Sequence, residues 1–392
     1  MKKKKKPEIR FEGFTDDWEQ RKLEDEAIEM LAGGDIDKSR VVESGKYPIY
    51  ANALTNDSIV GYYDDYYRVK APAVTVTGRG DVGHAQARTV DFTPVVRLLA
   101  IRSEHDAYFL ENAINNHGVI VESTGVPQLT VPQLGNYMIQ FPKTIEEETK
   151  IGEYFDNLDH LITLHQRKYE KLKNLKKSML KKMFPQKGCK VPGIRFSGFT
   201  DDWEQRKLLL ICDFEKGRGL SKDNIDNNGK YPCILYGQLF TDYGMFINTV
   251  YSKSNIISEE CKLSEKGDIL IPRCDTTPDG LGRASVLALD NVILGFDINI
   301  LKIKNKQKYD SGFVSVALNH HKKDLLSKVV GSTVRHLENK ELRDVSIEYP
   351  NSLEEQKKVG EYFQALDHLI TLHQRELEKL KNIKKTLLEK MF

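Results

Sequence analysis

The chain has 392 residues, which at about 150 residues per domain corresponds to two or three domains, and its 40% hydrophobic and 30% charged residues exclude a mainly disordered protein. The 59 basic and 57 acidic residues leave a formal net charge of only +2, so the chain as a whole is not strongly basic. No run approaches the roughly 18 apolar residues of a membrane span, and Lys2–Lys6 is not followed by an apolar segment, so we expect a cytoplasmic protein without a membrane partner.

Two segments of the chain each occur twice. Ile9–Leu23 returns as Ile194–Leu208 with 14 identities in 15 positions, and Ile151–Phe184 returns as Val359–Phe392 with 25 identities in 34 positions. The stretches between these segments differ from each other, although both contain the sequence Gly-Lys-Tyr-Pro. Because chance does not produce such identities, we infer an internal repeat of one fold whose surface has diverged more than its core.

The first repeated segment contains the sequence Gly-Phe-Thr-Asp-Asp-Trp-Glu-Gln-Arg-Lys-Leu. Thr15 and Thr200 are suitable N-cap residues, and two aspartates follow each of them in what would be the first turn. This pattern predicts that a short helix starts there in each copy.

The first variable region, residues 24–145, mixes predicted strands at residues 73–77 and 95–101 with a predicted helix at residues 106–116. Gly78–Gly83 matches the GxGxxG pattern of dinucleotide-binding domains. Only ten residues separate this segment from Pro94, and they favour a strand rather than the helix that a dinucleotide site requires. We therefore predict a turn between strands, and a nicotinamide enzyme is the weaker alternative.

Aromatic and basic side chains are interleaved in this first region. Such mixtures can contact phosphates and base edges, and an arginine in a glycine-rich turn can match the O6 and N7 atoms of guanine. Tyrosines that are half-buried on a sheet would give the same pattern. The candidate DNA-contacting residues of this region are Lys46, Tyr47, Tyr50, Asn52, Arg79 and His84.

Apolar residues recur every seven positions in residues 151–184 and again in residues 359–392, which predicts two helices of about 50 Å that pack along a seam. The apolar stripe is three positions wide, so each helix should touch more than one neighbour. The predicted seam and partner-docking residues are Ile151, Tyr154, Leu158, Leu161, His165, Leu172 and Leu175 in the first helix, and Val359, Tyr362, Leu366, Leu369, His373, Leu380 and Ile383 in the second.

Charge predicts how the two helices pair. Residues 146–159 contain six acids and one lysine, whereas residues 167–182 contain eight bases and one acid. In an antiparallel pair, the basic end of each helix meets the acidic end of the other. We therefore predict an antiparallel coiled coil, although each exposed ion pair contributes only about 0–1 kcal/mol.

The second variable region, residues 209–353, again mixes predicted strands at 268–272 and 292–303 with a predicted helix at 313–330. The five cysteines of the chain are odd in number and form no CxxC pair, so we expect neither a disulfide framework nor a metal site. The candidate DNA-contacting residues of this region are Lys230, Tyr231, Tyr236, Gln238, Arg273, Arg283, Ser332, Thr333 and Arg335.

Catalytic motifs are absent from the sequence. It contains no GxxxxGK[ST] phosphate loop, no HExxH, no GxSxG, and no Asn-Pro-Pro or Asp-Pro-Pro element of the amino-methyltransferase type. Two diverged copies without a catalytic constellation predict a binding protein rather than an enzyme.

The alternation of constant and variable segments, the doubled long helices, and the sequences at Gly331–Val334 and Glu354–Gln356 together resemble the DNA-specificity (S) subunit of type I restriction-modification systems. The resemblance covers essentially the whole chain, and it departs at Ser123–Val126, the first-half counterpart of Gly331–Val334. It implies an α+β fold in which two mixed α/β target recognition domains are separated by two long antiparallel coiled-coil helices, with an internal pseudo-twofold repeat. The predicted borders are 1–145 and 187–353 for the domains, and 146–186 and 354–392 for the helices.

The resemblance also implies a non-catalytic subunit that binds double-stranded DNA. Two methyltransferase (M) subunits would methylate adenine N6, restriction/translocase (R) subunits would cleave, and S-adenosylmethionine, ATP and Mg would bind to these partners rather than to this chain. Because the two variable regions differ, we expect an asymmetric bipartite target with a fixed spacer and half-site centres about one helical turn apart. The alternative is a duplicated coiled-coil adaptor that joins two protein partners without nucleic acid. Salt-insensitive binding of proteins would favour it, whereas a steep loss of DNA affinity with rising salt would favour the DNA-binding subunit.

Overall fold

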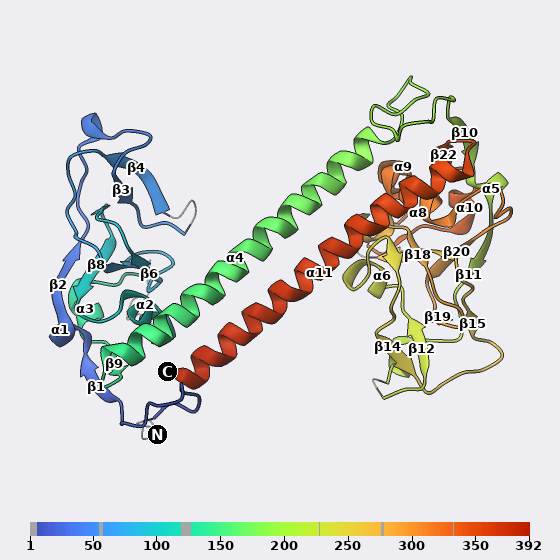
Figure 1. Ribbon diagram of the computed structural model, residues 1–392. Helices are drawn as coiled ribbons and strands as arrows, with labels where there is room; N and C mark the ends of the chain where they lie inside the picture. Colours follow the sequence, from blue (N-terminus) through green and yellow to red (C-terminus); the bar gives the residue numbers. More distant parts are fainter. Residues whose placement is uncertain (1–5, 55–57, 119–126, 227, 276–277, 332) are drawn as a thin grey trace. The chain divides into compact units, whose positions relative to one another are not determined.

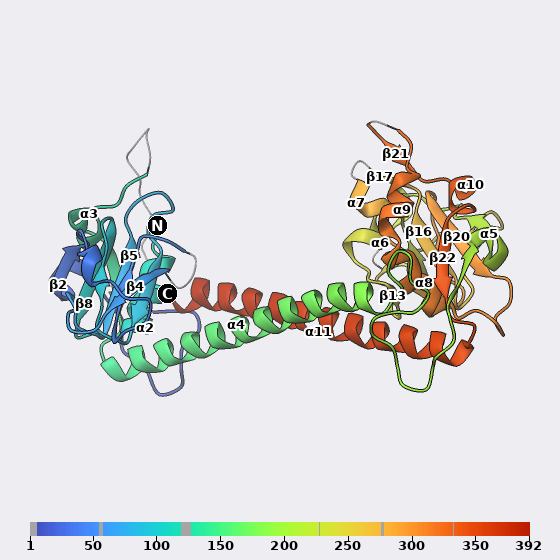
Figure 2. The same cartoon turned by 90° about the horizontal axis from the view of Figure 1, so that it is seen from above.

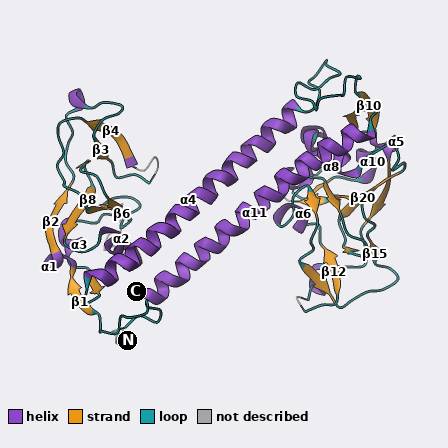
Figure 3. Ribbon diagram, in the orientation of Figure 1, coloured by secondary structure: helices purple, strands orange, loops and turns teal. Residues whose placement is uncertain are grey.

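The computed structural model describes residues 6–54, 58–118, 127–226, 228–275, 278–331 and 333–392. The chain divides into two compact units, unit 1 (Met1–His165 and Glu376–Phe392) and unit 2 (Gln166–Arg375). Each unit mixes helices and strands (Figure 1, Figure 3). In the part of the chain described, no helix is both long and apolar enough to span a membrane. The unit borders fall within the long helices, so the predicted division into four segments remains a prediction.

Unit 1 contains a four-stranded sheet in the order β2-β8-β5-β6, a three-stranded sheet in the order β4-β3-β7 and a two-stranded ribbon of β1 and β9. Its neighbouring strands are antiparallel, except that β3 and β7 are parallel. The elements are β1 (Glu19–Lys22), α1 (Leu23–Glu26), β2 (Ala27–Ala32), η1 (Lys38–Arg40), β3 (Tyr47–Tyr50), β4 (Ile59–Tyr63), β5 (Ala73–Thr77), β6 (Ala85–Arg88), β7 (Thr93–Pro94), β8 (Leu98–Ser103), α2 (Ala107–Asn116), α3 (Val131–Gly135), β9 (Met138–Phe141) and the first part of α4 (Ile145–Lys182).

Unit 2 contains sheets in the orders β11-β20-β16-β18-β13, β14-β12-β19-β15, β10-β22 and β17-β21. The elements are β10 (Glu204–Lys207), α5 (Leu208–Ile211), β11 (Cys212–Lys216), η3 (Lys222–Asn224), β12 (Tyr231–Ile234), α6 (Gln238–Thr241), β13 (Phe246–Ile247), β14 (Ser252–Ser254), β15 (Lys262–Leu263), β16 (Ile269–Pro272), β17 (Cys274–Asp275), α7 (Pro278–Leu281), β18 (Ser285–Leu287), β19 (Ile293–Leu294), β20 (Ile298–Ile303), α8 (Ser311–His320), α9 (Lys322–Ser327), β21 (Arg335–His336), α10 (Asn339–Leu342), β22 (Ser346–Tyr349) and the first part of α11 (Leu353–Met391).

The two units share one order of elements. The strands β2, β8 and β5 of unit 1 correspond to β11, β20 and β16 of unit 2, because both triplets follow the ribbon strand and pair in the same order. Unit 2 also contains α6, β13, β15, β17, α7, α9 and β21, which have no helix or strand counterpart among the described residues of unit 1. The internal repeat inferred from the sequence is therefore also a repeat of structure.

The main helix of each unit begins at an aspartate. Asp106 accepts a hydrogen bond from Phe109 N at 2.8 Å, and Asp310 accepts one from Phe313 N at 2.8 Å. Each carboxylate satisfies a backbone donor that the helix itself leaves free. The predicted helix at 106–116 is thus confirmed as α2, and the one predicted at 313–330 is observed as α8 and α9.

The short helix predicted to start at Thr15 and Thr200 is wrong. Both threonines lie outside any helix, and the following Glu-Gln-Arg-Lys segments form β1 and β10. β1 pairs with β9 in the register Glu19↔Phe141, and β10 pairs with β22 in the register Glu204↔Tyr349. Pairing with a distant strand supplies the backbone hydrogen bonds here, so it overrides the local N-cap signal.

A buried carboxylate ties the start of each long helix to the repeated N-terminal segment. Glu147 accepts hydrogen bonds from Arg10 Nε and Nη2 at 2.6 and 2.8 Å and from Trp18 Nε1 at 3.3 Å. Glu355 accepts the equivalent bonds from Arg195 at 2.7 and 2.8 Å and from Trp203 at 3.3 Å. We call these two sets of three residues the Arg-Trp-Glu clusters.

Each unit is completed by the end of the other repeat's helix. In unit 1, Phe392 after α11 lies 6.1 Å from Trp18 and 5.3 Å from Phe109 between ring centroids. In unit 2, Phe184 after α4 lies 5.5 Å from Trp203 and 5.8 Å from Phe313. The core of each unit thus requires residues from both halves of the chain.

Within each unit the segments of α4 and α11 lie side by side in opposite directions (Figure 1, Figure 2). In unit 1, Lys384 Nζ donates to both carboxylate oxygens of Asp159 at 2.7 Å. In unit 2, Lys176 pairs with Asp367. The positions are equivalent in the repeat, so each acidic helix start meets a basic helix end, as the charge pattern predicts.

The predicted seam residues divide into three groups. Ile151, Leu158, Val359 and Leu366 are buried. Half-buried positions are His165, Leu172, Leu175, Tyr362, His373, Leu380 and Ile383. Tyr154, Leu161 and Leu369 are 38–41% exposed, because one neighbouring helix cannot cover a stripe three positions wide. Their predicted part in partner docking remains a prediction.

Candidate functional site

Three loops meet at one end of the main sheet of unit 1. Because neighbouring strands are antiparallel, β2 and β5 end where β8 begins. Gly78 N, directly after β5, donates to Arg97 O before β8 at 2.9 Å. Of the candidate residues of this unit, Asn52, Arg79 and His84 come to this sheet end.

The Gly78–Gly83 segment is the turn that joins β5 to β6, as predicted. Gly80 and Gly83 have φ values of 78° and 85°, which favour glycine. Arg79 is half-buried, and the exposed His84 lies 3.1 Å from Asp81. The turn thus presents an arginine and a histidine at the sheet end, without the helix of a dinucleotide site.

Asn52 shapes this turn. Its Nδ2 atom donates to Arg79 O at 2.9 Å, and its Oδ1 atom accepts from Gly78 N at 2.7 Å. Both ends of the amide therefore bind the backbone, and the predicted contact of Asn52 with DNA would compete with these bonds.

The tyrosines of β3 differ in exposure. Tyr50 is buried: the Arg88 guanidinium carbon lies 3.7 Å from its ring centroid, and Phe92 packs at 5.4 Å. These neighbours cover its ring, and the predicted DNA contact of Tyr50 remains a prediction. Lys46 is exposed with Nζ 4.9 Å above the half-buried Tyr47 ring, at the opposite end of β3.

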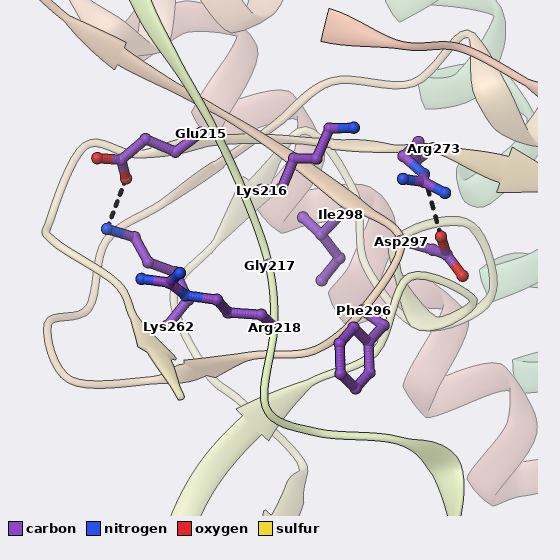
Figure 4. Close-up of a pocket in the computed structure, with 9 residues that line it drawn as sticks. All are labelled: Glu215, Lys216, Gly217, Arg218, Lys262, Arg273, Phe296, Asp297 and Ile298. Atoms are coloured by element: carbon purple, nitrogen blue, oxygen red, sulfur yellow. Dashed lines mark ion pairs between the residues drawn. The ribbon is translucent and has the colours of Figure 1, made fainter. Parts of the chain in front are cut away.

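The corresponding sheet end of unit 2 contains a cavity of about 640 Å³ (Figure 4). The ends of β11 and β16 and the start of β20 enclose it. Four of its lining residues are basic and two are acidic. The lining residues are Glu215, Lys216, Gly217, Arg218, Lys262, Arg273, Phe296, Asp297 and Ile298.

Arg273, a candidate from the sequence, lies in this cavity between two carboxylates. Its Nε atom is 3.1 Å from Asp297 Oδ1 and 3.6 Å from Glu338 Oε1. The Nε atom is buried and forms no hydrogen bond with any described residue, so the carboxylates hold the guanidinium by charge. Arg273 is therefore held inside the cavity between Asp297 and Glu338.

The other basic residues of the cavity are mostly paired. Lys216 donates to Glu338 at 2.8 Å and lowers the pKa of that carboxyl, and Lys262 lies 2.6 Å from Glu215. Arg218 is exposed and has no side-chain partner among the described residues, and Figure 4 shows its guanidinium extending toward Lys262. Phe296 adds an aromatic ring that is 52% exposed.

Several other candidates lie near this sheet end. Arg335 in β21 lies opposite Asp275 of β17 in the strand register, and β17 begins directly after Arg273. Burial raises the pKa of Tyr236 and, to about 11, the pKa of the Cys274 thiol. Thr333 is exposed, and Ser332 lies outside the described residues, as does the segment 123–126 of unit 1.

Gln238 and Arg283 form hydrogen bonds to other residues of unit 2. Gln238 accepts from Leu235 N at 3.0 Å and donates to Asp242 and Ser252. Arg283 Nη1 donates to Phe240 O at 3.1 Å, although its side chain remains exposed. Lys230 lies over the half-buried Tyr231 at 5.5 Å, repeating the arrangement of Lys46 and Tyr47.

The candidate residues chosen from the sequence do not include Arg68, Lys216, Arg218 or Lys262. Arg218 stands in a Gly-Arg-Gly sequence, like Arg79, so the same signal could have identified it. Arg68 has no such signal, because its position depends on tertiary contacts. Among the described residues, no group of three or more His, Cys, Asp or Glu side chains could hold a metal ion.

The family model described as the type I restriction modification DNA specificity domain matches residues 15–174 and 200–382. One similar protein is the type I restriction enzyme MjaVIII specificity subunit of Methanocaldococcus jannaschii. It is 25% identical over 68% of this chain, and the match covers 64% of the length of that subunit. The crystal structure of the type I restriction-modification S subunit from M. genitalium aligns with a TM-score of 0.73 at 18% identity over 99% of both chains, which shows the shared fold.

No catalytic family is indicated by these matches. The duplicated fold and the family model, which covers both repeats, agree with each other. This chain therefore belongs to the family of type I restriction-modification specificity subunits, and it carries two copies of the DNA specificity domain.

Proposed function

We propose that this chain binds an asymmetric bipartite DNA target with a fixed spacer and directs adenine N6 methylation and restriction by partner subunits. The observation that carries the proposal is one backbone plan in two units whose sheet ends carry different side chains. Unit 1 offers the Gly78–Gly83 turn, and unit 2 offers the cavity around Arg273. Two similar domains with different contact residues would recognise two different half-sites.

The proposed spacer function of α4 and α11 is supported by their ion pairs. Asp159 and Lys176 are 17 residues apart on α4, and their partners Lys384 and Asp367 are also 17 residues apart on α11. A single antiparallel coiled coil would require these equal spacings. Such a rod would hold the two half-sites at a set separation.

The proposed docking of two M subunits is supported by a duplicated exposed apolar surface. Leu161 and Leu164 on α4 are 41% and 38% exposed, and their repeat equivalents Leu369 and Leu372 on α11 are 41% and 45% exposed. Apolar residues repeated in this way offer two equivalent partner sites. S-adenosylmethionine, ATP and Mg would act on the M and R subunits.

The test is a genome-wide map of N6-methyladenine in cells that express the partner subunits with or without this chain. The proposal expects one bipartite motif that disappears without the chain. Replacing residues 24–145 with a variable region from another specificity subunit should change one half of the motif and leave the other half and the spacer unchanged. A motif that does not depend on the chain, or a replacement that changes both halves, would contradict the proposal.

A further inference from the structure

The same backbone position follows the first sheet strand in both units. Gly34, two residues after β2, donates from its N atom to Pro94 O in β7 at 3.2 Å. Arg218, two residues after β11, donates to Leu294 O in β19 at 2.9 Å. Gly34 of unit 1 is therefore the structural counterpart of Arg218 of unit 2.

In unit 2 this position carries a cation without a counter-charge. Lys216, Lys262 and Arg273 each lie within ion-pair distance of a carboxylate, whereas Arg218 has no side-chain partner in the described ranges. Its side chain is exposed at the rim of the cavity. An unpaired guanidinium beside paired cations leaves the rim with excess positive charge.

In unit 1 a guanidinium reaches this position from another segment. Arg68 Nη1 lies 2.8 Å from the point that a Cβ atom would occupy on Gly34. Any side chain at residue 34 would therefore displace it. Arg68 is exposed and also has no side-chain partner among the residues that the structure describes.

Arg68 and Arg218 occupy two different positions of the shared backbone plan, and in each unit the other position has no arginine. Val69 N donates to Phe92 O at 2.9 Å, and Ser264 N donates to Val292 O at 2.9 Å, so Val69 and Ser264 occupy equivalent positions. The residue before Val69 is therefore equivalent to the residue before Ser264. That residue is Arg68 in unit 1 and a leucine in unit 2. Unit 1 thus combines glycine with Arg68, and unit 2 combines Arg218 with leucine.

We propose that Arg68 and Arg218 are equivalent anchors, each of which binds one phosphate of the DNA backbone. A guanidinium offers several planar donors to phosphate oxygens, and phosphate contacts position a protein on any sequence. This explains why the two units keep the charge at one place, although their base-contacting residues differ. The inference rests on the proposed DNA-binding function and adds the residues that set its salt dependence.

The experiment measures binding of the full chain to a fluorescent DNA duplex of random sequence at several salt concentrations. Arg68→Ala and Arg218→Ala should each lower the slope of log K against log salt by about 0.9, and the double variant by about twice that. The matched controls are Arg40→Ala and Lys190→Ala, which also remove one exposed cation each, but from pairs with Asp65 and Asp202. The controls should leave the slope unchanged.

Arginine-to-lysine variants separate a phosphate contact from base recognition. Arg68→Lys and Arg218→Lys keep the positive charge, so they should retain the slope and the preferred bases. A changed base preference would overturn the phosphate assignment, and so would Arg→Ala slopes equal to those of the controls. Displacement of DNA by low concentrations of inorganic phosphate at constant ionic strength would instead identify a site for the free anion, which also overturns it.

DNA binding by the unmodified chain distinguishes failure of the proposed function from failure of the two phosphate anchors. If the unmodified chain does not bind DNA even at low salt, the proposed function fails. If the chain binds but both alanine variants behave as the controls do, only the anchor assignment fails.

Discussion

The two units differ little where they hold the long helices and strongly where their main sheets end. The Arg-Trp-Glu clusters agree within 0.1 Å, since the shortest bond is 2.6 Å in unit 1 and 2.7 Å in unit 2. At the sheet ends, by contrast, Gly34 corresponds to Arg218, and the residue after the β5 or β16 position is Gly78 in one unit and Arg273 in the other. The comparison teaches that one scaffold can keep its helix attachment fixed while its exposed end changes.

Removal of the buried glutamates should have the largest effect and tests whether the clusters are equivalent. Glu147→Ala or Glu355→Ala leaves a mostly buried arginine side chain and a buried tryptophan N–H without their acceptor, so each should lower the free energy of unfolding by about 3–5 kcal/mol. Urea unfolding followed by tryptophan fluorescence measures this, because each unit contains one of the chain's two tryptophans.

The neighbouring glutamates provide matched controls. Glu146 pairs with Lys150, and Glu354 pairs with Lys358, both on the exposed helix surface. Their replacement by alanine should change the free energy of unfolding by no more than about 0.5 kcal/mol. A large loss in one unit beside a small loss in the other would show that the clusters are not equivalent.

Features with a local or periodic cause could be predicted from the sequence. The long helices follow from the seven-residue apolar period, and α2 follows from the capping aspartate Asp106. β1 could not be predicted in this way, because its register depends on Phe141, more than a hundred residues away. The local Thr-Asp-Asp signal pointed to a helix that the chain does not form.

In the candidate site, too, features with a local cause could be predicted, whereas features that depend on distant segments could not. The Gly-Arg-Gly sequence around Arg79 correctly indicated a turn, since glycine at positive φ has a local cause. The burial of Tyr50 could not be predicted from the sequence, because it depends on Arg88 and Phe92 from other segments. Arg68 was missed for the same reason: only the folded chain places it against Gly34.

Removal of the ion pairs between α4 and α11 should have an intermediate effect on stability, and the size of the effect should differ between the two units. The Asp367 side chain is 10% exposed and also accepts a hydrogen bond from Met245 N at 2.6 Å, whereas the Asp159 side chain is 37% exposed. Asp367→Ala should therefore cost about 1–3 kcal/mol, because it leaves a buried N–H unpaired, and Asp159→Ala only about 0–1 kcal/mol. Equal losses in urea unfolding would contradict this difference, and Asp156→Ala on the exposed face of α4 serves as the control.

The smallest expected effect is a pH dependence of stability that arises from His105 in unit 1 and its two glutamate partners. Among the described residues, the equivalent positions of unit 2 carry no histidine. His105 Nε2 lies 2.8 Å from Glu26, and its Nδ1 atom lies 2.8 Å from Glu148. Burial lowers the pKa of His105, but the hydrogen bonds to the two glutamates outweigh burial and raise the pKa above its ordinary value of 6.5. In unit 2, Tyr309 and Gln356 occupy the positions of His105 and Glu148.

Because the folded state raises the pKa of His105, its contribution to stability is fully present below pH 6.5 and is lost as the pH rises through the folded-state value. The difference in unfolding free energy between the unmodified chain and His105→Gln should therefore be largest in mild acid and shrink above neutral pH. His160→Gln, at an exposed position of α4, controls for the loss of a histidine. A difference that grows with rising pH would mean that burial, rather than the two carboxylates, determines the protonation of His105.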